Sequence, residues 1–289
     1  MEVELPRRDR WGRCLLVPVG GGERASFTRA STMANYIADN TGLTIYQRRL
    51  LAIGLGLRED LAARAAALPR LHSERVDKKS LTRKQINEDK ATNAIIDELI
   101  ESALESAGAT YKANHGSAIH SLTEPDADPD VMPARMAADV FSYFERLAVD
   151  GIDTLATEVF VVNDTLTAAG TFDHLVRHPE YGIVVLDKKT GQVDGKGLQF
   201  AIQLATYAGA MVYDVITDER APLESLTGGE PVNRSVGIIA HIPLGAGRTD
   251  LYRIDLTQGF ERLATHVRTA RSVKDIMTPC ASLPSQMTA

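Results

Sequence analysis

Three apolar segments follow one another between residues 154 and 190, and each has the length of a β-strand. They read TLATEVFVVND, AGTFDHLVRH and GIVVLDKKT, with turn residues at Asn163-Asp164 and again from Pro179 to Gly182. Alternating or fully apolar runs bounded by such turns are typical of consecutive paired strands. These segments therefore require a sheet in the second half of the chain.

The apolar pattern before and after these segments is different. Upstream of residue 150 it has helical spacing, most clearly in 78–109 and 134–149. A helix at about 196–213, a strand pair at 235–244 and 248–256, and a closing helix at 257–276 follow. The order predicts a mixed α/β (α+β) fold, in which helices flank a central mixed sheet. We expect a mainly helical N-terminal region at 1–109, a candidate for DNA binding, and a core at 110–289.

Composition narrows the class of protein. The chain has 289 residues, is 44% hydrophobic and carries a formal net charge of −6, which argues against a nonspecific nucleic-acid binder. No apolar run reaches the roughly 20 residues that span a bilayer, and the N-terminus lacks the core of a signal peptide. Cys14 and Cys280 are too few for an iron–sulfur cluster, which usually takes four cysteines. A cytoplasmic protein without a membrane partner is expected.

The average charge hides a basic stretch at residues 43–90, where eleven Lys and Arg residues stand against six acids. One interpretation is a solvated helical surface. The other is a surface that faces phosphates on an otherwise acidic protein. The candidate DNA-contacting residues are Arg48, Arg49, Lys78, Lys79, Arg83 and Lys84.

The segment IVVLDKKT ends in charge. Because strand side chains alternate, Asp187 and Lys189 share one face while Lys188 points to the other. A carboxylate and an ammonium so placed suit metal-assisted hydrolysis, in which the acid holds a divalent cation and the lysine stabilises charge on the attacked phosphate. An ordinary salt bridge at an exposed strand end is the alternative.

A second acid, Asp173, lies in the preceding apolar segment. It stands seven residues before position 180 and Asp187 stands seven after it, so an antiparallel pair turning there would place the two side by side. Two acids inside apolar strands repel unless a positive charge lies between them. Mg²⁺ or Mn²⁺ would supply that charge, and so would a salt bridge from Lys189 alone.

Three further motifs are weak individually. Gln203 and Tyr207 are spaced i, i+4 and share a helix face. The alternative is that they belong to an ordinary helix surface without a functional role. His120 can act as a neutral imidazole ligand, although a lone histidine is more often structural. Together with Glu158, these residues complete an ordered series: GSAIH at 116–120, Glu158, GTFD at 170–173, DKK at 187–189 and QLATY at 203–207.

This series resembles the PD-(D/E)XK nuclease superfamily, especially its RecB-like branch of phage-encoded exonucleases. The resemblance covers roughly residues 110–257 and implies a restriction-endonuclease-like core. It implies an Mg²⁺- or Mn²⁺-dependent deoxyribonuclease, an exonuclease in phage DNA recombination, repair or replication, active in the host cytoplasm. DNA is the implied partner, with an annealing protein or a helicase as a separate chain, and related exonucleases form homo-oligomers.

The resemblance also assigns roles to residues. His120, Asp173, Asp187 and the backbone carbonyl of Lys188 become metal ligands, and Lys189 becomes the catalytic lysine beside Asp173 and Asp187. Gln203 and Tyr207 order the site and touch DNA, and Glu158 supports it. Two other hypotheses stay open: a nuclease-fold protein without turnover that binds DNA or has a structural role, and an enzyme of another class that carries these motifs by coincidence.

Overall fold

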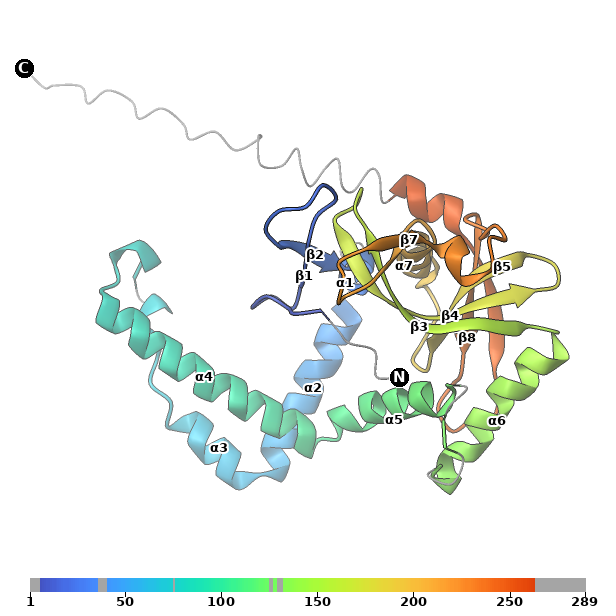
Figure 1. Ribbon diagram of the computed structural model, residues 1–289. Helices are drawn as coiled ribbons and strands as arrows, with labels where there is room; N and C mark the ends of the chain where they lie inside the picture. Colours follow the sequence, from blue (N-terminus) through green and yellow to red (C-terminus); the bar gives the residue numbers. More distant parts are fainter. Residues whose placement is uncertain (1–5, 36–40, 75, 125–126, 129–131, 263–289) are drawn as a thin grey trace, which may run out of the picture. The chain divides into compact units, whose positions relative to one another are not determined.

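The structure is a computed structural model, and it describes residues 6–35, 41–74, 76–124, 127–128 and 132–262. Its contacts divide the chain into two compact units (Figure 1). The first combines residues 1–38 with 122–289, and the second consists of residues 39–121. This division differs from the two regions expected from the sequence, because the N-terminal residues join the unit formed by the second half of the chain.

The first unit holds the sheet. Its strands are β1 (Cys14–Leu16), β2 (Ala25–Arg29), β3 (Asp153–Asn163), β4 (Ala168–His178), β5 (Gly182–Lys189), β6 (Met211–Tyr213), β7 (Arg220–Pro222), β8 (Val236–His241) and β9 (Asp250–Asp255). The main path through the sheet is β7-β6-β3-β4-β5-β8-β9, with β2 attached to β4 and β1 to β2. The pairs β5–β8 and β2–β4 are parallel and the rest antiparallel. The sheet is therefore mixed, as the sequence predicts.

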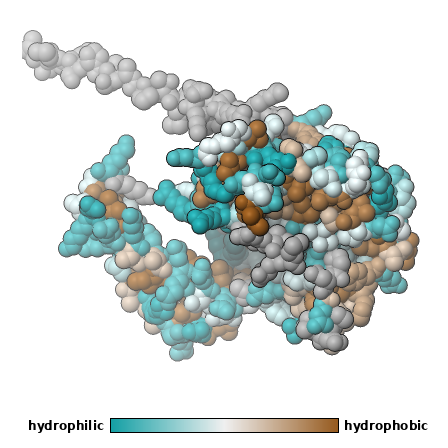
Figure 2. Space-filling model, viewed as in Figure 1, coloured by the Kyte–Doolittle hydropathy of each residue, from teal (hydrophilic) through white to brown (hydrophobic). Residues whose placement is uncertain are grey.

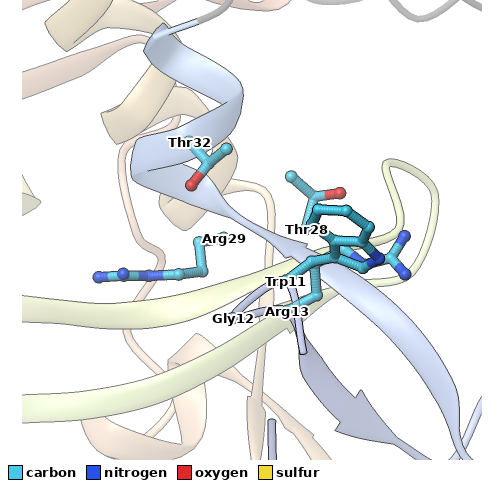
Figure 3. Close-up of a pocket in the computed structure, with 6 residues that line it drawn as sticks. All are labelled: Trp11, Gly12, Arg13, Thr28, Arg29 and Thr32. Carbon is cyan, nitrogen blue, oxygen red and sulfur yellow. The ribbon is translucent and has the colours of Figure 1, made fainter. Parts of the chain in front are cut away.

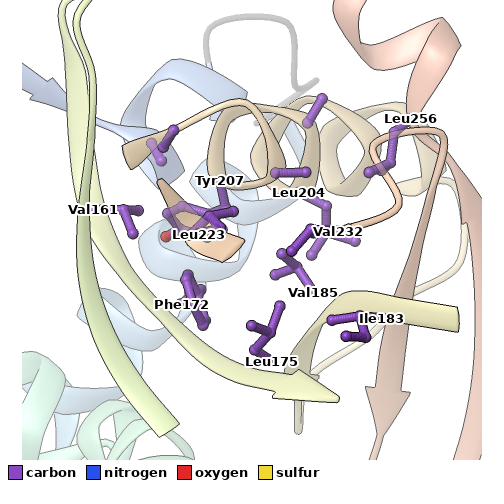
Figure 4. Close-up of a cluster of buried hydrophobic side chains, with 14 of the residues drawn as sticks. Val161, Phe172, Leu175, Ile183, Val185, Leu204, Tyr207, Leu223, Val232 and Leu256 are labelled. Carbon is purple, nitrogen blue, oxygen red and sulfur yellow. The ribbon is translucent and has the colours of Figure 1, made fainter. Parts of the chain in front are cut away.

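Helices cover both faces of this sheet. Within the described residues, the helices of the first unit are α1 (Ala30–Asn35), α6 (Ala134–Val149), α7 (Gly197–Ala208), the short 3-10 helix η4 (Leu223–Leu226) and the start of a further helix at 256–262. Leu204 on α7 packs in one core with Phe172 on β4 and Val185 on β5 (Figure 4). On the opposite face Tyr143 of α6 stacks on His174 of β4, with ring centroids 6.0 Å apart.

The second unit is helical. It contains α2 (Thr41–Leu57), α3 (Glu59–Ala66), η1 (His72–Glu74), η2 (Lys78–Ser80), α4 (Arg83–Ser106) and α5 (Ala109–Leu122), the last ending at the unit boundary. A capping box starts α4: Gln85 N donates to Thr82 Oγ1 at 3.3 Å, and Thr82 N donates to Gln85 Oε1 at 2.9 Å. The sequence predicts that Gly108 ends this helix. Its φ of 76°, which glycine adopts without strain, confirms the stop.

One edge of β4 positions the candidate site. One edge of β4 is paired with β3, from Ala168 to Arg177. The opposite edge, which carries the site, is shared by two strands: β2 pairs with Ala168 and Ala169, and β5 pairs from His174 onward. Because β2 runs parallel to β4 and β5 runs antiparallel to it, the carboxyl ends of β2 and β5 point toward each other. Only the residues of the GTFD motif, 170–173, separate them.

Two expectations need revision or lie beyond the described residues. The helix expected at 196–213 is too long: α7 ends at Ala208, and Met211–Tyr213 forms β6 instead. Gly209 follows the helix, where an added Cβ would meet the Phe260 ring at 3.1 Å. The closing helix expected at 257–276 is described only as far as residue 262. Among the described helices, none has the length and apolar character needed to cross a membrane.

Candidate active site

The antiparallel pairing of β4 with β5 brings Asp173 and Asp187 to the same level. The last ladder pair is His174 with Leu186, so the next position on each strand is one of these aspartates. There the ladder changes character: Lys188 N donates to the Asp173 carboxylate, Oδ2, at 2.6 Å. The predicted neighbourhood of the two strands is confirmed, and the site lies where their backbone pairing ends.

The sheet is irregular at this point. Phe172 and Leu175 both belong to the core under α7, although residues three apart on a regular strand point to opposite faces. On β3, Thr157 pairs with His174 and Val159 with Phe172, which leaves Glu158 at the level of Asp173. The φ of Glu158 is 49°, a conformation uncommon for a residue other than glycine. The irregularity lets β4 bury apolar side chains on both sides of Asp173 while its carboxylate reaches β5.

Asp187 is held by two side chains. It is 3% exposed, and Gln203 Nε2 donates to its Oδ1 at 3.0 Å. The Lys189 ammonium forms an ion pair with its Oδ2, which confirms that the two residues share a face. Lys189 Nζ also lies 5.9 Å from the centroid of the Phe200 ring on α7, and 27% of the lysine side chain is exposed. The lysine can therefore reach solvent or a ligand from this position.

Tyr207 follows Gln203 by one turn of α7. It is 4% exposed and points into the core beside Phe172 (Figure 4). Burial raises the pKa of its hydroxyl, and the carboxylates of Asp187 and Asp173 add to the rise, while Gln203 opposes it. Gly170 makes room for the ring, because a Cβ there would lie 3.2 Å from both Cε1 and Oη of Tyr207. The glycine of the GTFD motif is thus explained by the tyrosine of the QLATY motif.

The reverse face of β5 carries a buried charge that sequence reasoning missed. Lys188 is 0% exposed and its ammonium forms an ion pair with Glu124, while it donates to Thr123 Oγ1 at 3.1 Å. The same ammonium lies 5.9 Å from the centroid of the Tyr143 ring. The sequence predicts only that the Lys188 side chain points away from Lys189. Its burial depends on Glu124, which no local pattern connects to β5.

His174 and Tyr143 complete this reverse-face cluster. His174 is 1% exposed, and its Nε2 lies 3.9 Å from Glu124 Oε1. Burial raises the pKa of the Tyr143 hydroxyl, and the nearby carboxylates of Asp173 and Glu124 raise it further. Asp173 therefore contributes to the electrostatics of both faces. The strand end that carries the candidate site is fixed from behind by a buried ion pair.

The remaining predicted residues belong to the second unit. His120 lies near the end of α5 and is half-buried. Arg48 and Arg49 on α2, Lys79 on η2, and Arg83 and Lys84 on α4 are exposed, and Lys78 lies in η2. Hydrophilic residues cover much of the visible surface of α3 and α4 (Figure 2). Each unit is defined by itself, so the roles of His120 and of the basic residues stay predictions.

The donor set at the strand ends consists of hard oxygen atoms. Two carboxylates, Asp173 and Asp187, meet at an otherwise apolar sheet, and the backbone carbonyl of Lys188 follows Asp187 directly in sequence. Oxygen ligands of this kind suit Mg²⁺ or Mn²⁺. Within the described residues, no three His, Cys, Asp or Glu side chains gather closely enough to hold a metal ion by themselves. The pair fits part of a coordination shell, in which water and phosphate oxygens would supply the other ligands.

Comparison with known proteins adds no relative: no family model matches the chain, and no curated protein matches it.

Proposed function

We propose that this protein hydrolyses phosphodiester bonds in DNA with a divalent cation, on a PD-(D/E)XK nuclease core of the restriction-endonuclease-like kind. One observation carries the proposal. Asp173 and Asp187 lie at the same level on paired strands, and Lys189 contacts Asp187 at the point where the backbone pairing stops. This is the arrangement that a G-x-x-D and D-x-K nuclease requires of its strands.

The side chains divide the work in this proposal. Asp173, Asp187 and the Lys188 carbonyl would hold Mg²⁺ or Mn²⁺, with His120 as a further ligand. The cation, when bound, supplies Lewis-acid polarisation of the phosphate and lowers the pKa of water. Gln203 holds Asp187 in one orientation through its hydrogen bond. Lys189 stabilises the negative charge that develops on the phosphate oxygens, as a positioned ammonium does in a site partly closed to water.

Lys189 has to change partner for this role. Its ammonium now neutralises Asp187, and a bound cation would take over that task. The flexible four-carbon stem of lysine then lets the ammonium turn toward the phosphate. The proposal therefore gives this ion pair two uses: Lys189 neutralises the buried Asp187 carboxylate before the metal binds, and its ammonium is released for the substrate afterwards.

The wider setting follows from the resemblance. We propose an exonuclease of phage DNA recombination, repair or replication, working in the cytoplasm as a homo-oligomer, together with a single-strand annealing protein or a helicase. The exposed basic residues of the second unit would bind the phosphate backbone.

The test compares four variants of the full-length protein on linear and on closed circular DNA, with Mg²⁺ and with EDTA. Asp187→Asn and Lys189→Ala are expected to lose cleavage by at least about a hundredfold, since each removes a charge from the reacting centre. Asp194→Asn and Lys196→Ala are the matched controls, because both residues are exposed and follow the same strand. Cleavage of linear DNA alone supports an exonuclease.

Retention of full activity in either site variant, with an unchanged circular dichroism spectrum, would refute the assignment. A protein without turnover is the second candidate, and the ion pair between Lys189 and Asp187, a self-sufficient neutralisation, favours it. Titration of the wild-type protein with Mn²⁺ separates the two. A nuclease site should bind the ion and raise the thermal midpoint, and Asp187→Asn should abolish that rise. A protein that neither cleaves DNA nor binds Mn²⁺ would belong to the second candidate.

A further inference from the structure

A pocket lies at the carboxyl end of β2, outside the residues used above. It has a volume of about 330 Å³ and is lined by Trp11, Gly12, Arg13, Thr28, Arg29 and Thr32. Its side chains offer an indole, two guanidinium groups and two hydroxyls, and no carboxylate. In Figure 3 the Arg29 side chain extends away from Trp11, so the Arg29 guanidinium and the Trp11 ring lie at different ends of the pocket.

The residues around the pocket are arginine-rich. Residues 6–29 contain six arginines and no lysine, against only two acids, Asp9 and Glu23, in a chain whose net charge is −6. Arginine is the residue that recognises phosphate with a planar, bidentate fork. The local composition therefore runs against that of the whole protein, and it favours an anionic ligand.

The turn that carries Trp11 is held by hydrogen bonds. Trp11 is 69% exposed, and the Arg10 guanidinium lies 5.0 Å from the centroid of its ring. The Asp9 carboxylate holds the turn beneath it, because Oδ1 accepts from Trp11 N at 2.8 Å and from Arg13 N at 3.0 Å. Arg13 Nε donates to Asp9 Oδ2 at 2.7 Å. An exposed indole on an organised turn loses little entropy when a flat group stacks on it.

Arg29 supplies the charge at the other end. Its side chain is exposed, and within the described part of the chain no hydrogen bond or ion pair engages its guanidinium. β2 ends here beside Ala169, on the same edge of β4 where β5 begins to pair at His174. At about 3.3 Å per residue, the five steps between those positions span roughly 17 Å. The pocket therefore opens a short way along the sheet edge from Asp173 and Asp187.

We propose that this pocket binds one unpaired nucleotide of a single DNA strand, with its base stacked on Trp11 and its phosphate on Arg29. The hydroxyls of Thr28 and Thr32 add donors for the phosphate oxygens. A base can stack on an indole only when it is not stacked in a duplex, so the pocket selects a single strand. The inference rests on the proposed nuclease function, and it deepens that function by naming a substrate class and a route toward the candidate site.

Trp11 is the chain's one tryptophan, so tryptophan fluorescence reports on this pocket alone. The experiment titrates the full-length protein with oligothymidylate in EDTA, where cleavage does not interfere. Stacking of a base is expected to quench the fluorescence in a saturable way. Arg29→Gln should weaken the apparent affinity about tenfold, because it removes one charge-assisted hydrogen bond to a phosphate. Arg7→Gln is the matched control, because Arg7 is exposed and lies outside the pocket.

Further titrations distinguish single-stranded DNA from other phosphate-containing ligands. A blunt-ended, fully paired DNA duplex should quench much less than the single strand, and thymidine monophosphate or inorganic phosphate should bind far more weakly than the oligonucleotide. Quenching by thymidine monophosphate that equals that of the oligonucleotide would overturn the proposal in favour of a small-molecule site. Equal affinities of the wild type and Arg29→Gln would overturn it as well.

The two proposals can fail separately. A labelled oligonucleotide that binds by anisotropy, and is cleaved with Mg²⁺, while Trp11 fluorescence stays constant would refute the pocket and leave the nuclease standing. Absence of both binding and cleavage would refute the pocket together with the proposed function. Trp11→Phe, followed by anisotropy, checks the stacking independently: it should retain most of the affinity, and Trp11→Ala should lose roughly tenfold.

Discussion

Lys188 lies in an environment that is unusual for a lysine. Lysine is almost never fully buried unless it is paired, and here its ammonium meets Glu124 and Thr123 behind the strand that carries Asp187. Removal of one partner from a buried ion pair leaves the other charge without compensation, which costs far more than the pair itself contributes. The stability of this strand end therefore depends on both residues together.

We expect Lys188→Met to lower the free energy of unfolding by about 3 kcal/mol, since Glu124 then keeps a poorly solvated carboxylate. The double variant Lys188→Met/Glu124→Gln should recover at least about 1 kcal/mol of that loss. Lys84→Met is the control, because Lys84 is 86% exposed and its Nζ lies 3.8 Å from Glu88 Oε1, where an ion pair contributes little. Urea unfolding measures all three, and a double variant that is no more stable than Lys188→Met would contradict the coupling.

Local patterns in the sequence predict part of this site and miss part of it. Asp173, Asp187 and Lys189 could be placed because a single turn and strict alternation relate them. Gln203 could be placed by helical spacing. The pairing of Lys188 with Glu124 could not, since 64 residues separate them in sequence and neither residue is unusual where it stands. The irregularity at Glu158 could not be predicted either, because the sequence does not reveal a positive φ at a glutamate.

At the scale of elements, long elements were predictable and short ones were not. The strands β3, β4 and β5 each contain enough residues to show their period, and so does α4. The strands β6 and β7 have three residues each, too few for a pattern. β2 is defined by its pairing with β4, more than a hundred residues away, which only the folded chain provides.

The packing of α2 against α4 depends on one glycine. A Cβ on Gly54 would lie 1.8 Å from the backbone oxygen of Ala103, which cannot move aside as a side chain would. Gly56, two residues later in the same helix, has no atom within 4 Å of such a Cβ. The same substitution at these two positions therefore separates steric packing from the intrinsic helix preference of alanine.

Gly54→Ala should destabilise the second unit by about 3 kcal/mol, because α2 has to shift away from α4. Gly56→Ala should instead stabilise it by about 0.5 kcal/mol, because alanine lowers the entropy of the unfolded chain and favours the helix. Thermal unfolding followed by circular dichroism at 222 nm gives both values. An equal response of the two variants would mean that α2 does not pack on α4 in this way.

At the scale of the whole molecule, charge is unevenly distributed. The chain is acidic, yet its basic residues gather at 43–90 and at 6–29. Some of them are already neutralised: Arg58 pairs with Asp60 at 2.7 Å, and Arg64 pairs with Glu98 at 3.0 Å. Arg48 and Arg49 are exposed, with no ion pair to any described residue. This difference decides which arginines are available to phosphates.

Under the proposed function, binding of DNA in EDTA should depend on salt to an extent that these arginines determine. The double variant Arg48→Gln/Arg49→Gln should reduce the slope of log K against log salt by roughly 2, one unit for each phosphate that the variant no longer neutralises. Arg58→Gln/Arg64→Gln, the control, should change the slope by less than roughly 1, since its carboxylate partners already satisfy those charges. Fluorescence anisotropy at several salt concentrations measures the slopes. Identical slopes in the wild type and the first variant would exclude Arg48 and Arg49 as phosphate-binding residues.

β2 covers the part of the β4 edge that β5 does not reach, and this has a consequence for truncated forms of the chain. A strand edge without a neighbour offers its amide and carbonyl groups to any extended peptide. A fragment that begins after Arg29 would lack β2, so Ala168 and Ala169 would be exposed and a second molecule could add a strand there. Such a fragment should self-associate, although every residue of the two-aspartate centre would still be present in it.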